Sequence, residues 1–138
     1  MKELLETLRK NKTIYFGGKA DVHHNIDARK FLAEEGFAVF PDEFFSLVKY
    51  ANGIRNDQAA IYAILPEEDD TGFADAVWVN DALNRQDRTT VAVLGETNFD
   101  YLVYDTKTKQ YQLRDKESDD IINRFSSLSD AIKRIFAI

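Results

Sequence analysis

Three short apolar segments follow one another closely near the end of the chain, and this pattern limits the possible folds more than any other feature. They span residues 91–94, 99–104 and 110–114, and links of hairpin length join them. Links this short connect neighbouring antiparallel strands, because a parallel pair needs a crossover of about a dozen residues or more. The segments therefore predict an antiparallel meander, and residues 120–125 are a candidate for a fourth, edge strand.

Helical spacing of apolar residues marks two segments in the first quarter of the chain. Residues 2–11 form one, and residues 27–35 form the other, between Asp27 as its N-cap and Gly36 just after its end. Residues 12–26 lie between them and show no such spacing, so an irregular segment is expected there.

The next helix has the clearest boundaries. Pro41 stands where a first-turn proline belongs, and the dipeptide Asn52-Gly53 fits a C-cap that needs a positive φ. All three residues are therefore interpreted as structural. A strand is expected over residues 59–65, and because both of its sides are apolar it is expected at the centre of a sheet.

Two further helices complete the pattern. Residues 74–87 favour a helix, although residues 76–79 also fit a short strand, and residues 128–137 favour a closing helix with Ser127 as its N-cap. Helices, then strands, then a helix predict an α+β fold, with helices packed around a twisted, mainly antiparallel sheet. The 138 residues include no Pro/Gly/Ser-rich linker, so one domain is expected over residues 1–138.

The charge balance narrows the range of partners. Lys and Arg number 18 against 24 Asp and Glu, for a formal net charge of −6. An acidic chain is a poor candidate for binding the phosphate backbone of a nucleic acid and a better one for meeting a basic partner. Phe99, Tyr101, Tyr104 and Tyr111 could stack on bases, but no basic groove accompanies them, and packing beneath helices is the simpler explanation.

Cysteine usage and hydropathy exclude further classes. The chain has no Cys, which excludes a disulfide scaffold, a thiolate zinc site and a cysteine nucleophile. It has no apolar leader and no apolar segment of membrane-spanning length. A soluble, cytoplasmic protein without a membrane partner is therefore expected.

His23 and His24, the only histidines, suggest an alternative function, that of a small metal-dependent hydrolase. In a loop, both could face one ion together with Asp21 or Asp27. Adjacent residues do not share a helix face, however, and no spacing in this segment matches a known metal motif. A solvated loop is favoured, and no metal, cofactor or catalytic residue is expected.

Clustered carboxylates are the candidates for contact with a basic partner. The run 67–70 could mimic phosphates toward a basic nuclease cleft, although a solvated loop is the simpler explanation. Residues 115–120 could hold a cation or an acid–base pair, but they lack the glycine and distal Glu of a calcium loop, which favours a solvated turn. The residues predicted to contact a partner are Asp57, Glu67, Glu68, Asp69 and Asp70.

Three stretches of the sequence together resemble a known family. Residues 40–53 are similar to the "Leu-Pro, acidic, aromatic, helix, Asn-Gly" signature of the SUKH superfamily, with Phe40 in place of the Leu. The second stretch continues through Ile54-Arg55 into the strand at 60–64. The third resembles the YrhA-like branch of that superfamily, and it comprises Leu94-Gly95-Glu96, residues 100–105, residues 111–115 and the Phe-Ser-Ser-Leu of 125–128.

The resemblance covers about residues 34–137 and implies an α+β fold with helices around a twisted antiparallel sheet. Many bacterial members look like immunity proteins that bind and neutralise a cognate toxin, often a nuclease, inside the producing cell, whereas others act as regulatory scaffolds. The resemblance implies no catalytic residue. Arg55 could pair with a carboxylate such as Glu96 or contact a partner. The motif residues interpreted as structural are Pro41, Asn52, Gly53, Arg55, Gly95 and Glu96.

Overall fold

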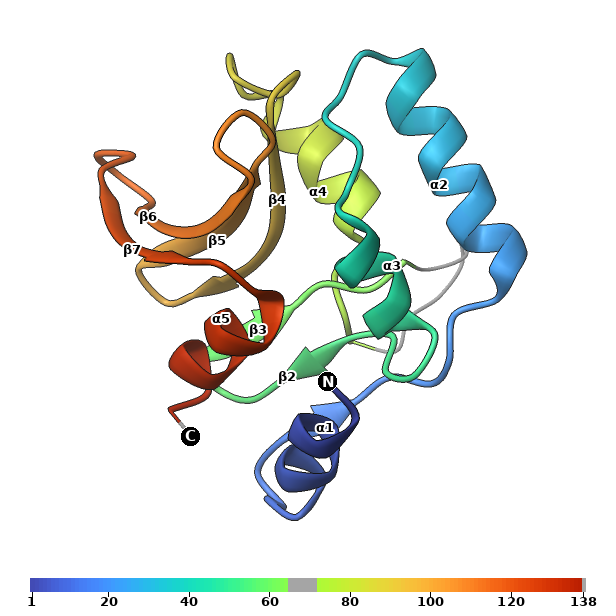
Figure 1. Ribbon diagram of the computed structural model, residues 1–138, viewed down its shortest axis with the longest axis vertical. Coiled ribbons are helices and arrows are strands. Elements are labelled where there is room, and N and C mark those ends of the chain that lie inside the picture. Colours follow the sequence, from blue (N-terminus) through green and yellow to red (C-terminus); the bar gives the residue numbers. More distant parts are fainter. Residues whose placement is uncertain (65–71, 138) are drawn as a thin grey trace.

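The computed structural model describes residues 1–64 and 72–137, and its centre is a seven-stranded antiparallel sheet. The strands lie side by side in the order in which they occur in the chain (Figure 1). The predicted meander is therefore confirmed, and with it the α+β class. The strands are β1 (Tyr15–Phe16), β2 (Ile54–Arg55), β3 (Ala59–Ile61), β4 (Val91–Thr97), β5 (Asp100–Asp105), β6 (Gln110–Asp115) and β7 (Ile121–Phe125).

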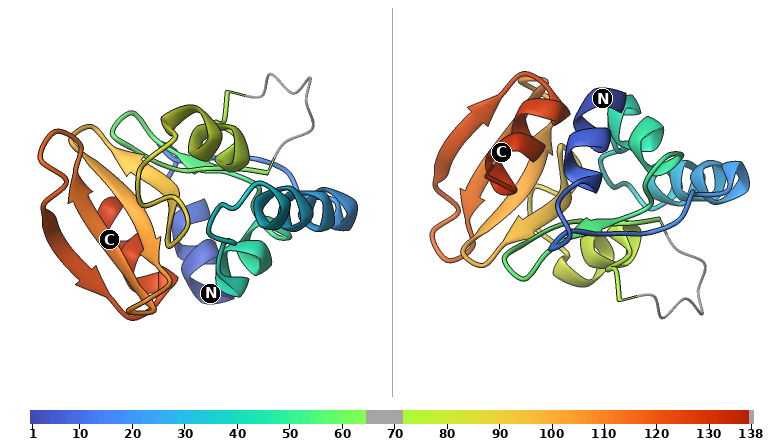
Figure 2. Two further views of the ribbon diagram at one scale, coloured as in Figure 1. Left: turned by 90° about the horizontal axis from the view of Figure 1, so that it is seen from above. Right: turned by 90° about the horizontal axis from the view of Figure 1, so that it is seen from below.

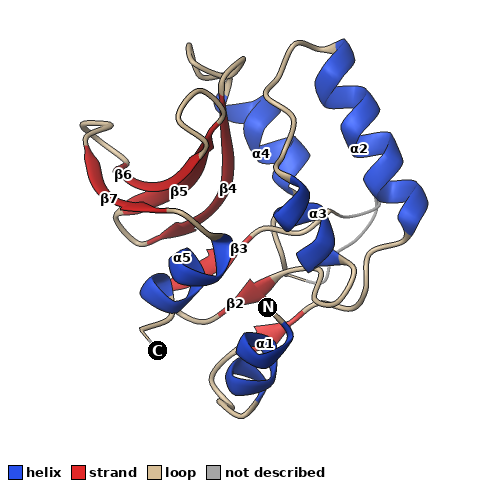
Figure 3. Ribbon diagram, in the orientation of Figure 1, coloured by secondary structure: helices blue, strands red, loops and turns tan. Residues whose placement is uncertain are grey.

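The helices of the described part cover this sheet unevenly. Seen from below, α5 crosses the face of the curled strands β4–β7, whereas α2 and α3 lie away from it beyond α1 (Figure 2). Colouring by secondary structure shows α2 and α3 on the side of the molecule away from β7 (Figure 3), whereas the views from above and below place α4 across β2 and β3 from α3 (Figure 2). None of these helices has the length and apolar character that a membrane span requires. They are α1 (Lys2–Arg9), α2 (Val22–Glu34), α3 (Asp42–Val48), α4 (Ala76–Leu83) and α5 (Leu128–Ile135).

Helix α2 begins well before the start predicted at residue 27. Its N-cap is Asp21, whose extended backbone precedes the helix and whose carboxylate accepts the His23 N–H at 2.8 Å. The prediction that Asp27 caps the helix is therefore wrong, because Asp27 lies inside it. The end of the helix agrees with the sequence, since Gly36 follows it with a φ of +74°.

The apolar spacing did not predict the early start of α2, because one of the buried positions of this helix is polar. The buried residues of this helix are Asn25, Ala28 and Leu32, which lie on one face at helical spacing. A buried Asn interrupts the apolar period, so only the later part of the helix resembles an amphipathic helix. The segment 12–26, expected to be irregular, thus holds both β1 and the first turns of α2.

The strand predicted at 59–65 is shorter than expected but central. β3 ends at Ile61, because the hydrogen-bond partners then change: the Ala63 N–H donates to the Ala74 carbonyl at 2.8 Å, away from β4. Residues 61–64 are nevertheless all buried, and β3 lies between β2 and β4. The prediction of a central strand with two apolar sides is confirmed, and only its length is wrong.

Other boundaries shift by a few residues. α4 is shorter than the predicted 74–87, because Asn84 adopts a left-handed conformation (φ 44°) at its end. Pro41 is the N-cap of α3 rather than a residue of its first turn. β7 confirms the edge strand expected at 120–125, and Ser127 caps α5 through a side-chain hydrogen bond of 3.2 Å, as predicted.

Asn52-Gly53 does not form the predicted C-cap, because α3 already ends at Val48. Asn52 is buried, and it accepts the Ile64 N–H at 2.7 Å and donates to the Ile64 carbonyl at 2.8 Å. Gly53 has a φ of +103°, so the expected positive φ is confirmed. A third segment passes so close that a Cβ on Gly17 would lie 1.8 Å from the Asn52 carbonyl oxygen. The pair therefore has a structural role where three segments cross.

Aromatic packing centres on α3. The rings of Phe40, Phe44 and Phe45 are nearly fully buried, with centroids 5.3, 5.8 and 6.3 Å apart. Of the aromatic residues expected to pack beneath helices, Tyr111 does so, since it is 1% exposed and its hydroxyl donates to Glu43 Oε1 at 3.0 Å, whereas Phe99 is 77% exposed and does not. Burial and the neighbouring Glu43 carboxylate raise the pKa of Tyr111.

Candidate functional site

Three turns of the meander lie at the same end of the sheet. The register pairs Ala59 with Thr97 and Asp100 with Asp115, so the β2–β3, β4–β5 and β6–β7 connections share this end. Asp57, a residue predicted to contact a partner, lies in the first of these turns. The surface is named the turn end and is defined by Asp57, Phe99, Glu117, Asp120 and Ile122.

Phe99 projects from the turn end. At 77%, it is the most exposed large hydrophobic residue of the described part. Thr97 Oγ1 accepts the N–H groups of Phe99 and Asp100 at 3.3 and 3.0 Å, and the Lys116 N–H donates to the Phe99 carbonyl at 2.9 Å. These bonds hold the turn while the ring stays outside the core. An aromatic ring presented in this way is typical of a contact surface.

A hollow of about 310 Å³ lies beside Phe99. Gln58, next to Asp57, lines it from the β2–β3 turn, Ile122 lines it from β7, and Arg134 lines it from α5. Because Ile122 is 52% exposed, apolar surface continues from the aromatic ring to the outer strand of the sheet. The turn end therefore lies beside both this hollow and the unpaired edge of β7, the outermost strand of the sheet.

Three carboxylates lie in the turns at this end of the sheet. Asp57, Glu117 and Asp120 are exposed, and the described residues contain no ion pair to any of them. Asn56 shapes the first turn, because its Oδ1 accepts two backbone N–H groups at 2.9 and 2.8 Å and leaves Asp57 at the tip. Within the described residues, the turn end thus presents three carboxylates without an ion pair, and Arg134 adds a positive charge at the adjoining hollow.

Residues 115–120 form a hydrogen-bonded turn. The Asp115 carboxylate accepts the backbone N–H groups of Ser118 and Glu117 at 2.9 and 2.8 Å, and these bonds hold the pKa of Asp115 below its usual value. Asp119 binds Arg85 at 2.8 Å. Asp115 and Asp119 thus both have partners within the protein, which agrees with the prediction that this segment is a turn.

The sequence suggested an ion pair between Arg55 and Glu96, but the structure does not contain it. Ala60 of β3 lies between them in the register, so the two residues are two strand spacings apart, about 10 Å. Lys116 Nζ binds Glu96 Oε2 at 2.6 Å instead. The Arg55 guanidinium lies over the ring of Tyr15, 4.9 Å from its centroid.

Gly95 has the structural role that its motif predicted, and its cause is a close approach of two strands. The register of β4 shifts between Val93 and Gly95, and a Cβ on Gly95 would lie 2.4 Å from the Ala60 carbonyl oxygen. The remaining residues predicted to contact a partner lie outside the described residues: Glu67, Glu68, Asp69 and Asp70.

Sequence reasoning missed a charge network around Arg114, which is 8% exposed. Arg114 binds Asp87 at 3.0 Å, Asp105 at 3.6 Å and Asp119 at 3.7 Å, and Arg85 also binds Asp87 at 2.9 Å. Burial opposes ionisation of Asp87, but the two guanidinium groups outweigh it and lower its pKa. The alternation of polar and apolar residues along β6 predicts an exposed Arg114, but the strand is buried on both sides, so the sequence carried no signal for this network.

His23 and His24 lie in the first turns of α2, not in the loop that the sequence suggested. Consecutive helical residues project about 100° apart, so the two rings do not converge on one ion as loop residues could. Within residues 1–64 and 72–137, no group of three His, Asp or Glu side chains is placed to hold a metal. The correction follows directly from the N-cap at Asp21.

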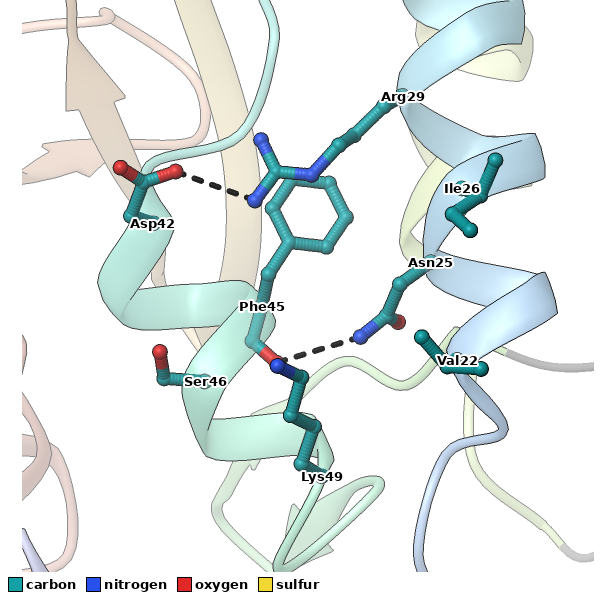
Figure 4. Close-up of a pocket in the computed structure, with 8 residues that line it drawn as sticks. All are labelled: Val22, Asn25, Ile26, Arg29, Asp42, Phe45, Ser46 and Lys49. Atoms are coloured by element: carbon teal, nitrogen blue, oxygen red, sulfur yellow. Dashed lines mark hydrogen bonds and ion pairs between the residues drawn. The ribbon is translucent and has the colours of Figure 1, made fainter.

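A second hollow, of about 240 Å³, lies between α2 and α3 (Figure 4). Val22 and Ile26 of α2 form an aliphatic rim, with 56% and 55% of their surfaces exposed. Ser46 and Lys49 line the other side from α3. This hollow is named the α2–α3 groove, and the sequence could not show it because the start of α2 was missed.

Polar groups lie at the floor and one end of the α2–α3 groove. The Arg29 guanidinium lies 3.9 Å from the Phe45 ring centroid and binds Asp42 Oδ1 at 3.1 Å. Asn25, which is 4% exposed, donates from Nδ2 to the Phe45 carbonyl at 3.4 Å (Figure 4). Its Oδ1 is buried without a hydrogen-bond partner among the described residues.

The fold is that of an α+β meander domain, and both hollows described above are lined by apolar and charged side chains. No protein-family model matches the chain, and a search of curated proteins finds no match. The resemblance to the SUKH superfamily therefore stays a prediction that rests on the sequence motifs.

Proposed function

We propose that this chain is a protein-binding domain whose turn end docks on a basic partner. The observation that carries the proposal is Phe99, an aromatic side chain 77% exposed on a hydrogen-bonded turn and flanked by unpaired carboxylates. Aromatic anchors commonly dominate the energy of protein interfaces. The surrounding charge selects the partner, because exposed carboxylates attract a positively charged surface and repel an acidic one.

We further propose that the partner is a cognate bacterial toxin, and that binding neutralises it inside the producing cell. The sequence motifs that resemble the SUKH superfamily support this step, as does the net charge of −6. Nucleases that grip nucleic acid carry basic clefts, so an acidic, aromatic surface is complementary to such a toxin. The role proposed is binding, with no catalytic residue and no cofactor.

The test is affinity capture from the native cell's lysate at low salt, with the wild-type chain and Phe99→Ala as baits. The expected result is one basic protein that the wild-type chain retains and Phe99→Ala loses. A Trp78→Ala bait is the matched control, because Trp78 is an aromatic residue of α4 that is 66% exposed. That bait should retain the partner.

The captured protein is then expressed with and without this chain. Toxicity that co-expression of the wild-type chain relieves, and that Phe99→Ala relieves less, supports the proposal. Charge reversal at Asp57, Glu117 and Asp120 should slow association and reduce its salt dependence. A partner that binds Phe99→Ala as tightly as wild type would exclude the turn end, and a harmless partner would exclude the toxin assignment.

A further inference from the structure

We infer that the α2–α3 groove binds the C-terminal residue of a peptide chain, when that residue carries an aliphatic side chain. The inference does not depend on the turn end or on the toxin assignment. Three features of the groove correspond to three groups of such a residue. An aliphatic rim fits its side chain, and two polar groups without a partner among the described residues fit the rest: a buried amide oxygen fits its N–H, and an ammonium group fits its carboxylate.

The rim sets the size and polarity of the ligand. Val22 and Ile26 lie one turn apart on α2 and flank the groove, and more than half of each residue is exposed (Figure 4). A ligand side chain between them would remove apolar surface of both from water. The volume of about 240 Å³ is below that of most sites for drug-sized ligands, so the groove suits a single residue.

Asn25 provides the polar recognition at the floor. A buried oxygen without a donor is unfavourable, and native proteins rarely leave one unpaired. The hydrogen bond that holds this carboxamide is long, at 3.4 Å to the Phe45 carbonyl, and the terminal torsion of Asn is soft. Because Oδ1 is buried, the carboxamide must turn and the side chains that cover it must move before this oxygen can accept a backbone N–H in the groove.

The positive charge of the groove favours a ligand that has a carboxylate and no free amino group. Lys49, the C-cap residue of α3, lines the groove (Figure 4) and forms no ion pair within the described residues. Arg29 adds a second positive charge, and its partner Asp42 supplies the only negative charge among the described residues that line the groove. A free amino acid would bring its own ammonium group close to these cations, whereas a chain terminus carries a neutral amide there.

The test is a titration of the ¹⁵N-labelled protein with N-acetylleucine, followed by amide chemical shifts. Saturable shifts of α2 and α3 amides are expected, whereas N-acetylleucinamide and free leucine should bind more weakly. Equal binding of the amide would overturn the carboxylate assignment. Tighter binding of free leucine would overturn the chain terminus, and shifts absent from the groove would overturn the site.

Two variants make the test specific to the groove. Lys49→Gln should raise the Kd for N-acetylleucine about tenfold, the size of effect expected from losing one charged hydrogen bond. Lys30→Gln is the matched control, because Lys30 lies on α2 but binds Glu34, at 3.9 Å, and does not line the groove. Well-dispersed spectra confirm folding of both variants. An unchanged Kd in Lys49→Gln, or an equal increase in Lys30→Gln, would contradict the proposed site.

Discussion

At the scale of single residues, Asn52 shows how one side chain can hold distant segments together. Its carboxamide pairs with both backbone groups of Ile64, as a neighbouring strand would, although no strand runs there. Its own N–H donates to the Gly18 carbonyl at 2.6 Å. Three parts of the chain therefore meet at this residue, and the two bonds to Ile64 require a side chain with both a donor and an acceptor.

Replacing Asn52 with Ala should lower the free energy of unfolding by about 3 kcal/mol, because the buried N–H and carbonyl of Ile64 both lose their partner. Urea unfolding followed by fluorescence measures the change. Asn98→Ala, at an exposed turn position, should change the free energy by less than about 0.5 kcal/mol. Equal effects of the two substitutions would show that the Asn52 bridge contributes little.

At the scale of elements, the start of α2 depends on a cap rather than on apolar spacing. The Asp21 carboxylate satisfies a backbone N–H that the first turn leaves without a partner. The sequence analysis placed the cap at Asp27, and the structure assigns it to Asp21. The choice matters beyond the helix, since it places Val22, Asn25 and Ile26 along the α2–α3 groove.

Asp21→Ala should therefore destabilise the protein by about 1 kcal/mol, the usual effect of losing an N-cap. Asp27→Ala removes the same charge from an exposed position within the helix and should have a smaller effect. Thermal unfolding of both variants distinguishes the two residues. A larger loss of stability in Asp27→Ala than in Asp21→Ala would instead support Asp27 as the N-cap.

At the scale of the whole molecule, the Arg114 network connects the segment after α4 with β5, β6 and the β6–β7 turn. Arg85 and Asp87 follow α4, Asp105 ends β5, and Asp119 lies in the turn. Every charge within it has an opposite partner, which offsets the unfavourable burial of Arg114. The network therefore links these segments through ion pairs that weaken when acid protonates the carboxylates.

Acid should destabilise the fold through Asp87. Its pKa is lower in the folded than in the unfolded protein, so the stabilisation is complete above the unfolded pKa, about 4, and is lost as pH falls through the folded value. Urea midpoints measured from about pH 6 downward should fall, and Asp87→Asn should flatten that dependence. Asp57→Asn is the control at an exposed carboxylate. A profile that Asp87→Asn leaves unchanged would assign the acid sensitivity elsewhere.

Strand pairs that are close in the sequence could be predicted, whereas contacts between distant segments could not. The strands at the C-terminal end were predictable, because each pairs with its neighbour through a short turn. β1 and β2 were missed, because each has two residues and they pair across a distance of about forty positions. Arg55 and Glu96 were suggested as a pair for a related reason: only the register shows that Ala60 lies between them.

Sequence alone therefore determined the class of fold, the meander and the acidic character of the surface. Hairpin spacing and composition are local or summed properties, and they do not depend on how distant segments meet. Tertiary structure decided the sites. The turn end collects residues from three turns, and the α2–α3 groove depends on a buried Asn that breaks the apolar pattern. Neither arrangement follows from spacing, because exposure and pairing are settled only when the elements pack.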